Sequence, residues 1–362
     1  GAGAIAVNVA TTERAVSAAL DGGSLASEGD VSIKAEGKEG VSSLALIGAG
    51  ADTGAGVVLA NVTRELSDVS VDVARTNATT INAQSLAIAG DYLGRFNALG
   101  VSGAGSGAAA GAVNVNVNYG DNDVGVSVGK LSAAVSEKAE IEARRRTENS
   151  GIAVNASGSQ YAAVSATVLV NTVEGAARTE INGAKIGSKE GREAAVSVRS
   201  LGSDTMKLVD VTAAGAIVGG GAAVMVNRLY GSALTTVADS HLAGGSVTVA
   251  AEQNRFVDAT NVFASAGLGA LGANVVSTLI GADGDPFASE QTSLGATQKQ
   301  IDEYLSTYAG SGSTSDPGIF ASALGQTDGV LTDDEKKTMM QAAAQSAAAD
   351  APAGATHVSV TG

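Results

Sequence analysis

The chain contains no cysteine and no tryptophan, and aromatic residues make up only 3% of its 362 residues. Without cysteine it can form neither a disulfide framework nor a thiolate metal site, so its stability must come from packing and backbone hydrogen bonding. So few aromatic residues leave little to fill a broad globular core, and 48 glycines suit backbones that pack closely. The composition therefore favours a thin, layered interior.

Proline is absent from residues 1–285, and its three copies are Pro286, Pro317 and Pro352. Proline has no backbone N–H to donate, so it is rare in strands that have a neighbour on both sides. Its absence is expected of a chain in which most strands lie inside a sheet.

Basic residues are also few, because 22 lysines and arginines stand against 37 acidic residues, for a formal charge of −15. This charge repels nucleic acid and anionic lipid. The one basic cluster, Arg144–Arg146, has acidic residues on both sides and is interpreted as a solvated strand end. Residues 261–282 are long enough to span a bilayer, but they contain Asn, Ser and Thr and match a phrase repeated elsewhere. We therefore expect no nucleic-acid partner and no membrane insertion.

The sequence does contain a repeated phrase, which reads GAGAIAVNVA at 1–10, GAGVVLANV at 54–62 and GAAAGAVNVNV at 107–117. An asparagine near the end of each such phrase recurs at intervals of 53, 55, 55, 56 and 47 residues. A period of this size indicates a repeat architecture rather than one closed core. These marker asparagines are Asn8, Asn61, Asn116, Asn171, Asn227 and Asn274.

Within one period, apolar residues alternate with small or polar ones. In residues 112–119 the alternation places Val113, Val115 and Val117 on one face of a strand and the intervening asparagines on the other, with one face buried. Such strands recur roughly every 10–12 residues, separated by turn-forming residues. Both a solenoid and a series of antiparallel sandwiches fit this rhythm. The missing proline, the small side chains and the uninterrupted repeat favour the solenoid.

A period near 55 residues is interpreted as two or three coils of such a solenoid. Consecutive marker asparagines would then not be neighbours on one wall, and no asparagine ladder would form. We accordingly expect these side chains to face outward or to cap turns. A polar row that contacts glycans is the functional alternative.

The phrases GAGAIAVNVA, GAGVVLANV and GGGAAVMVNRL, followed by strands such as VSIKA and VTVAAEQ, resemble the repeat regions of very large secreted bacterial adhesins. They are similar in particular to filamentous adhesins of the leukotoxin type, which are related in style to filamentous haemagglutinin and autotransporter passengers. The resemblance covers about residues 1–285. It implies a right-handed parallel β-helix, export from a Gram-negative cell, and display at or release from its surface. It carries over no catalytic motif.

The alternation stops in the last part of the chain. Residues 293–310 have apolar residues at helical spacing, and residues 332–350 begin with a capping box in which Thr332 precedes Glu335. The sequence thus predicts solenoid repeats over 1–287, a helical insertion over 288–350 and a return to a solenoid strand over 351–362. Insertions at a turn cost little and often contact partners.

No group of residues supports catalysis or cofactor binding. His241 and His357 have no cysteine partners and no nearby repeated acids, so a zinc site is not expected, and no G-x-S-x-G elbow precedes a helix. Residues 324–335 have partial EF-hand spacing through Asp328 and Glu335 but lack the early carboxylates of a calcium site, and a turn before a capped helix explains them equally. We assign no catalytic, cofactor-binding or metal residue and expect no enzyme.

These features together predict a non-enzymatic structural stalk, one segment of a longer bacterial adhesin that is secreted or displayed on the outer cell surface. The alternative is a module that binds a host glycan or surface protein directly through the helical insertion.

Overall fold

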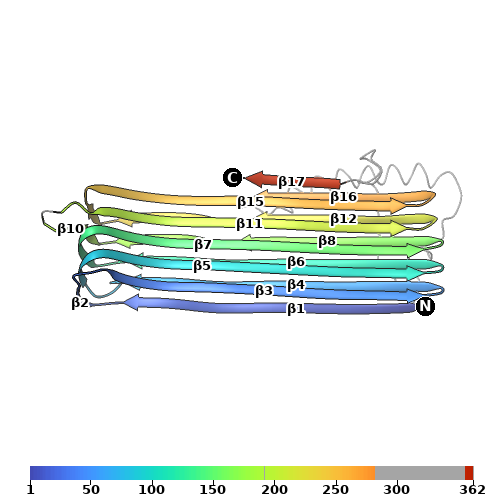
Figure 1. The fold of residues 1–362 in the computed structure, drawn as a ribbon, viewed down its shortest axis with the longest axis horizontal. Helices are drawn as coiled ribbons and strands as arrows, with labels where there is room; N and C mark the ends of the chain where they lie inside the picture. Colours follow the sequence, from blue (N-terminus) through green and yellow to red (C-terminus); the bar gives the residue numbers. More distant parts are fainter. Residues whose placement is uncertain (191, 282–354, 362) are drawn as a thin grey trace.

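The computed structural model describes residues 1–190 and 192–281 with their side chains, and the backbone of residues 355–361. In this part of the chain every regular element is a β-strand and none is a helix. The strands form two sheets stacked face to face, and the chain crosses from one sheet to the other at both edges of the slab (Figure 1). The described part of the chain is therefore all-β with a solenoid-like architecture.

In the first sheet the strand order is β1–β4–β6–β8–β12–β16, and β9 and β13 extend it beside β6. The strands of the first sheet are β1 (Ala2–Leu20), β4 (Gly54–Val73), β6 (Ala109–Val128), β8 (Ala162–Glu174), β9 (Ala176–Asn182), β12 (Val218–Leu229), β13 (Ser232–Ala238) and β16 (Gly269–Ile280).

The second sheet contains the path β14–β10–β7–β11–β15–β17, and β5 joins β2 and β3 to β7. The strands of the second sheet are β2 (Gly23–Ala26), β3 (Val31–Ala51), β5 (Thr79–Ser106), β7 (Leu131–Ser159), β10 (Lys185–Ser188), β11 (Ala195–Gly215), β14 (His241–Ala243), β15 (Ser246–Ala266) and β17 (Ala355–Thr361).

One sequence period forms one coil of the stack. Strand β1 pairs in parallel with β4 so that Asn8 lies beside Asn61, and β4 pairs with β6 so that Asn61 lies beside Asn116. The interpretation of a period as two or three coils is therefore wrong. Its physical reason is strand length, because β4 has 20 residues and β5 has 28, so two strands and their turns use the whole period.

The two edges of the slab differ. Along one edge, at the right of Figure 1, two-residue turns such as 52–53 and 107–108 join the second sheet to the first. Along the other edge most connections are longer, and three of them include the short strands β2, β10 and β14, although residues 129–130 alone join β6 to β7. We call the strand segments beside the short turns, such as 43–51 and 54–63, the tight-turn half, and the rest of the slab the long-loop half.

The long-loop half has an apolar interior. Its core is a cluster of buried aliphatic residues from both sheets, including Val69, Val71, Ile88 and Ile141, each at most 1% exposed. Many outward positions on the same strands are polar or charged, as at Asp68, Asp72 and Glu142. Alternation of this sense is usual for a protein in water.

The tight-turn half reverses this arrangement. In this half of β6 the buried side chains include those of Asn114, Asn116 and Asn118, and the outward row contains Val113 and Val117. The alternation thus predicts a strand with one buried face correctly, and the buried face is the asparagine face.

Strand β17 lies at the end of the second sheet and pairs with β15 in the antiparallel sense, with Phe256 beside Thr361. The other strand pairs in the described part of the chain are parallel. The predicted helical insertion over 288–350 and the calcium-like spacing at 324–335 lie outside the described residues.

Candidate functional site

Asparagine side chains form a ladder inside the tight-turn half, from one coil to the next. Asn118 donates through Nδ2 to Oδ1 of Asn171 at 2.7 Å, and Asn171 donates in the same way to Asn227 at 3.1 Å. Asn227 then donates to Oγ1 of Thr278 at 3.3 Å. One row away, Asn8 donates to Oδ1 of Asn61 at 3.3 Å.

The marker asparagines therefore do not face outward or cap turns, and that expectation is wrong. Asn61, Asn116, Asn171 and Asn227 are at most 1% exposed. Because each period is one coil, the register places an inward asparagine of one coil above that of the next. Buried amides need partners, and an amide is both donor and acceptor, so a column of asparagines can supply its own.

Other asparagines connect the two sheets across the interior. Asn155 on β7 donates to the carbonyl oxygens of Ala112 at 2.9 Å and Ala166 at 2.7 Å, which belong to the first sheet. Asn114 on β6 donates to the carbonyl oxygen of Gly100 on β5 at 2.9 Å. The side chain of Asn116 leaves no room for a Cβ at Gly100, which would lie 2.6 Å from its Nδ2. Small side chains thus allow the sheets to approach closely here.

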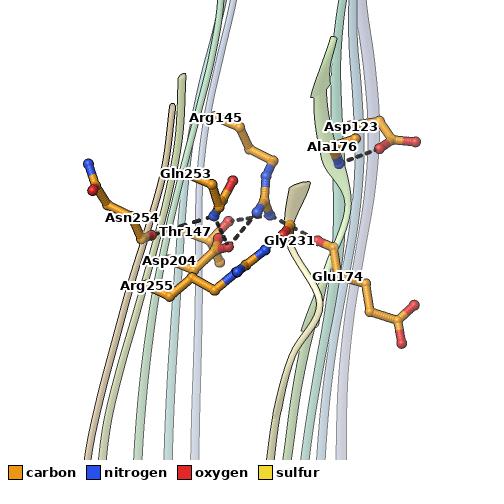
Figure 2. A network of polar contacts seen from close by, with 10 residues as sticks. All are labelled: Asp123, Arg145, Thr147, Glu174, Ala176, Asp204, Gly231, Gln253, Asn254 and Arg255. Carbon is orange, nitrogen blue, oxygen red and sulfur yellow. Dashed lines mark hydrogen bonds and ion pairs between the residues drawn. The ribbon is translucent and has the colours of Figure 1, made fainter. Parts of the chain in front are cut away.

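A buried ion pair lies near the middle of the slab (Figure 2). Nη2 of Arg145 on β7 contacts Oδ2 of Asp204 on β11 at 2.6 Å, and both side chains have no exposed surface. Arg145 also donates to the carbonyl oxygen of Glu174 at 2.9 Å, and Gln253 donates to Asp204 at 2.8 Å.

A break in the first sheet makes room for this ion pair. Strand β8 ends at Glu174 and β12 ends at Leu229, so local carbonyl groups are free to accept from arginine: Glu174 accepts from Arg145 and Gly231 from Arg255. Gly231 is required by space, because a Cβ there would lie 1.9 Å from Oδ2 of Asp204 and 2.0 Å from Nη2 of Arg145.

The arginine cluster is therefore more than a solvated strand end, and that interpretation is wrong for Arg145. Arg144 faces outward and contacts Glu142 at 2.6 Å, and Arg146 is exposed. Alternation along β7 turns the middle arginine inward, where its charge is met by Asp204. Burial raises the pKa of Asp204, although Arg145, Arg255 and Gln253 each favour its carboxylate form.

Two further carboxyl groups are buried without a cation. Glu65 has no exposed surface, and Tyr92 donates a hydrogen bond from its hydroxyl to Oε1 of Glu65. Burial, reinforced by the nearby Glu39, raises the pKa of Glu65 to about 8. Burial likewise raises the pKa of Asp210 to about 7, although hydrogen bonds from Thr212 and Thr167 oppose the rise. Both groups are mostly or partly protonated at neutral pH.

These polar groups are sealed between the sheets, so their arrangement supports structural roles rather than contact with a substrate. In the described residues no group of three or more His, Asp or Glu side chains has the placement of a metal site. A surface hollow of about 520 Å³ lies at the long-loop edge and is lined by Lys185, Arg192, Glu193 and His241, among others. Short strands and turns carry these four side chains, and we assign them no chemistry.

Sequence reasoning named no site residue and so did not find Arg145, Asp204 or Glu65. The signal that could have found Arg145 is its position in the strand alternation, because it lies on the same buried face of β7 as Ala143 and Thr147. Of the apolar stretch considered as a bilayer span, residues 261–266 form the end of β15 and residues 269–280 form β16. The described residues contain no helix of the length and hydropathy needed to cross a membrane.

No protein-family model, curated protein or solved structure matches this chain.

Proposed function

We propose that this chain is a non-enzymatic structural segment of a bacterial adhesin that is secreted or displayed on the outer surface of a Gram-negative cell. In this role it is a stiff stalk that holds a binding element away from the cell. The observation that supports the proposal is continuous stacking, since parallel pairing continues from β1 through β4, β6, β8 and β12 to β16. The likeness of its repeated phrases to those of filamentous adhesins supports the location.

Stiffness would follow from the polar and ionic contacts between coils. Hydrogen bonds run along the stack from Asn118 to Asn171 and from Asn171 to Asn227. The ion pair of Arg145 with Asp204 connects the neighbouring strands β7 and β11 of the second sheet. Bending the stack would lengthen these bonds on one side. The proposal includes a right-handed winding sense and a helical insertion at 288–350, both of which the family resemblance or the sequence pattern implies.

Electron microscopy of negatively stained tandem copies tests the stalk. Each coil adds about 4.8 Å along the stack, whereas the longest strand, at 29 residues, spans about 95 Å. The expected particle is therefore a flat ribbon of constant width whose length grows with the number of copies. Separate globules joined by flexible connections would contradict the proposal.

Direct binding of a host glycan or surface protein through residues 288–350 is the second candidate. It is favoured by the loss of strand alternation in that stretch and by its predicted helices. Deleting residues 288–350 should then abolish attachment to host cells while leaving the circular-dichroism spectrum of the sheets intact. Undiminished attachment would remove this candidate and leave the stalk unaffected.

A further inference from the structure

We propose that the tight-turn half of the slab inserts into the hydrocarbon region of a lipid bilayer, with the short turns leading. The inference does not rest on the stalk function. It departs from the sequence-based expectation of no membrane insertion, which considered only an apolar span at 261–282 and the net charge. We call the outward-facing side chains of the tight-turn half the apolar band.

On the first sheet the apolar band is made of columns of aliphatic side chains that cross the strands. One column contains Val7, Ala60, Val115, Val168, Val224 and Val275, which the parallel register places side by side. Ile5 and Val9 begin the flanking columns and are 78% and 63% exposed, and Val7 is 68% exposed. Such contiguous apolar surface is far more than the scattered exposed residues of an ordinary soluble surface.

The opposite face of the slab has the same character. On the second sheet Leu46 lies beside Val101, which lies beside Val154, and the column continues through Val211 to Val262. Leu44 and Leu46 are 59% and 64% exposed. The apolar band therefore covers both faces of the tight-turn half.

The apolar band has a charge-free surface and sharp limits. Among the described residues, the first outward charges on the first sheet are Arg64 and Arg228, one column beyond Val62 and Val226. On the second sheet Lys207 begins the charged columns. In the described short turns the one charged residue is Asp52, which lies at the leading edge.

The depth of the apolar band matches the dimensions of lipid. Residues 54–62 of β4 extend about 30 Å from the turn, and residues 152–158 of β7 extend about 23 Å, at about 3.3 Å per residue. The hydrocarbon core of a bilayer is about 30 Å thick. Insertion up to Arg64 would leave that guanidinium at the level of the lipid headgroups.

The interior of this half agrees with an apolar exterior. Many of the side chains sealed inside it are asparagine, serine and threonine, beside a small aliphatic cluster that includes Val57, Ala110 and Ala112, whereas the outward columns are aliphatic. A shift of one residue would exchange the two faces and bury the valines, which water would favour. Backbone N–H and C=O groups of successive strands pair with each other along the stack, which lipid requires of any inserted chain.

Lipid fits this surface better than a second copy of the chain. The apolar band covers two opposite faces and approaches the edge between them, so a flat partner docked on one face would leave the other in water. A fluid hydrocarbon covers both faces and the edge together. Because the net charge is −15, the suitable probe is a zwitterionic bilayer rather than an anionic one.

The absence of cysteine makes a direct depth measurement possible. Single-cysteine variants V115C, in the apolar band, and S127C, on the outward face of the same strand in the long-loop half, would carry an environment-sensitive fluorophore. With phosphatidylcholine vesicles we expect V115C to shift to shorter wavelength and to be quenched by lipids brominated on their tails. S127C should show neither effect. Equal quenching at both positions, or quenching at neither, would overturn the proposal.

A binding experiment with matched variants completes the test. The double variant V115D/V168D places two charges in the apolar band. Its affinity for the same vesicles, measured by flotation, should fall on the order of a hundredfold. L93D introduces a charge on an outward apolar residue of the long-loop half and should bind as the unmodified chain does. Circular dichroism verifies folding of all variants. If V115C instead shifts without vesicles as protein concentration rises, and sedimentation shows dimers, a second copy covers the apolar band and the lipid proposal is wrong.

Discussion

Asn118 donates a hydrogen bond to Asn171 across 53 residues of sequence and 2.7 Å of space. The two side chains occupy the same place in successive coils, and Asn171 repeats the contact with Asn227. Since each amide both donates and accepts, the contact can pass from coil to coil without a change of residue type. If one strand slipped by one residue, its asparagines would lie beside aliphatic side chains of the next coil and would lose these hydrogen bonds. The ladder therefore helps to fix the alignment of the stack.

Replacing Asn171 with alanine should lower the free energy of unfolding by about 1–3 kcal/mol, because buried groups of Asn118 and Asn227 lose a partner. Urea denaturation followed by circular dichroism measures the change. The matched control is Asn97→Ala on β5, where the asparagine is exposed on the outward face. Similar losses for the two variants would contradict an energetic role for the ladder.

Removing one partner of the buried ion pair should be costly. Arg145→Leu leaves Asp204 buried without its guanidinium and should lower the free energy of unfolding by about 3–5 kcal/mol. The double variant Arg145→Leu with Asp204→Leu removes both charges and should recover a large part of that loss. Arg146→Leu, on the outward face of the same strand, serves as control and should have little effect. A double variant as unstable as the sum of its single variants would show that the charges do not compensate each other.

Glu65 makes the stability of the fold depend on pH. Its folded pKa of about 8 lies above the ordinary value of 4.5, so the folded state binds the proton more tightly than the unfolded state. The stabilisation is complete below about pH 4.5 and is lost as the pH rises toward 8, by up to about 1.4 kcal/mol per pH unit. Glu65→Gln keeps an acceptor for Tyr92 and cannot ionise.

Urea titrations from pH 4 to pH 9 compare this variant with the unmodified chain. We expect the variant to be more stable than the unmodified chain toward pH 8 and to show no such advantage near pH 4. Other carboxyl groups, including Asp210, are common to both proteins and cancel in the difference. A difference in stability that stays constant over this range would mean that Glu65 does not titrate as its burial requires.

Gly120 is fixed by the ring of Phe96 on the facing sheet. A Cβ at position 120 would lie 2.2 Å from Cζ of Phe96, so Gly120→Ala should cost about 1–3 kcal/mol through overpacking. The control is Gly125→Ala on the same strand, where a Cβ would meet nothing within 4 Å. Combining Gly120→Ala with Phe96→Leu should recover part of the loss in thermal denaturation, and no recovery would show that the ring is not the obstacle.

The strands and the solenoid-like stack could be predicted from the sequence, but the length of a coil could not. Glycine inside a strand resembles a turn signal, and β5 contains Gly90, Gly94 and Gly100 without ending at any of them. In the fold these glycines allow side chains of the facing sheet to approach, such as Asn116 at Gly100. Sequence alone does not distinguish a glycine that turns the chain from one that admits a neighbour.

The buried charged residues and their partners also could not be predicted from the sequence pattern. Alternation along β7 gives Arg145 its inward parity, but its partner Asp204 is 59 residues away. Only the correct register brings the two together, and the register depends on the coil length. Glu65 shares the inward row of Asn61 and Thr63, and its high pKa follows from a degree of burial that composition does not reveal.

Because a single repeat closes a single coil, loss or duplication of one whole repeat at the level of the gene would change the height of the slab by about 4.8 Å and nothing else in its cross-section. Joining residue 108 directly to residue 162, for instance, would put Ala162 of β8 where Ala109 of β6 had followed. Unequal recombination between copies could thus lengthen or shorten such a protein in uniform steps, whereas deletion of an odd number of residues within a strand would exchange inward and outward side chains along the rest of that strand.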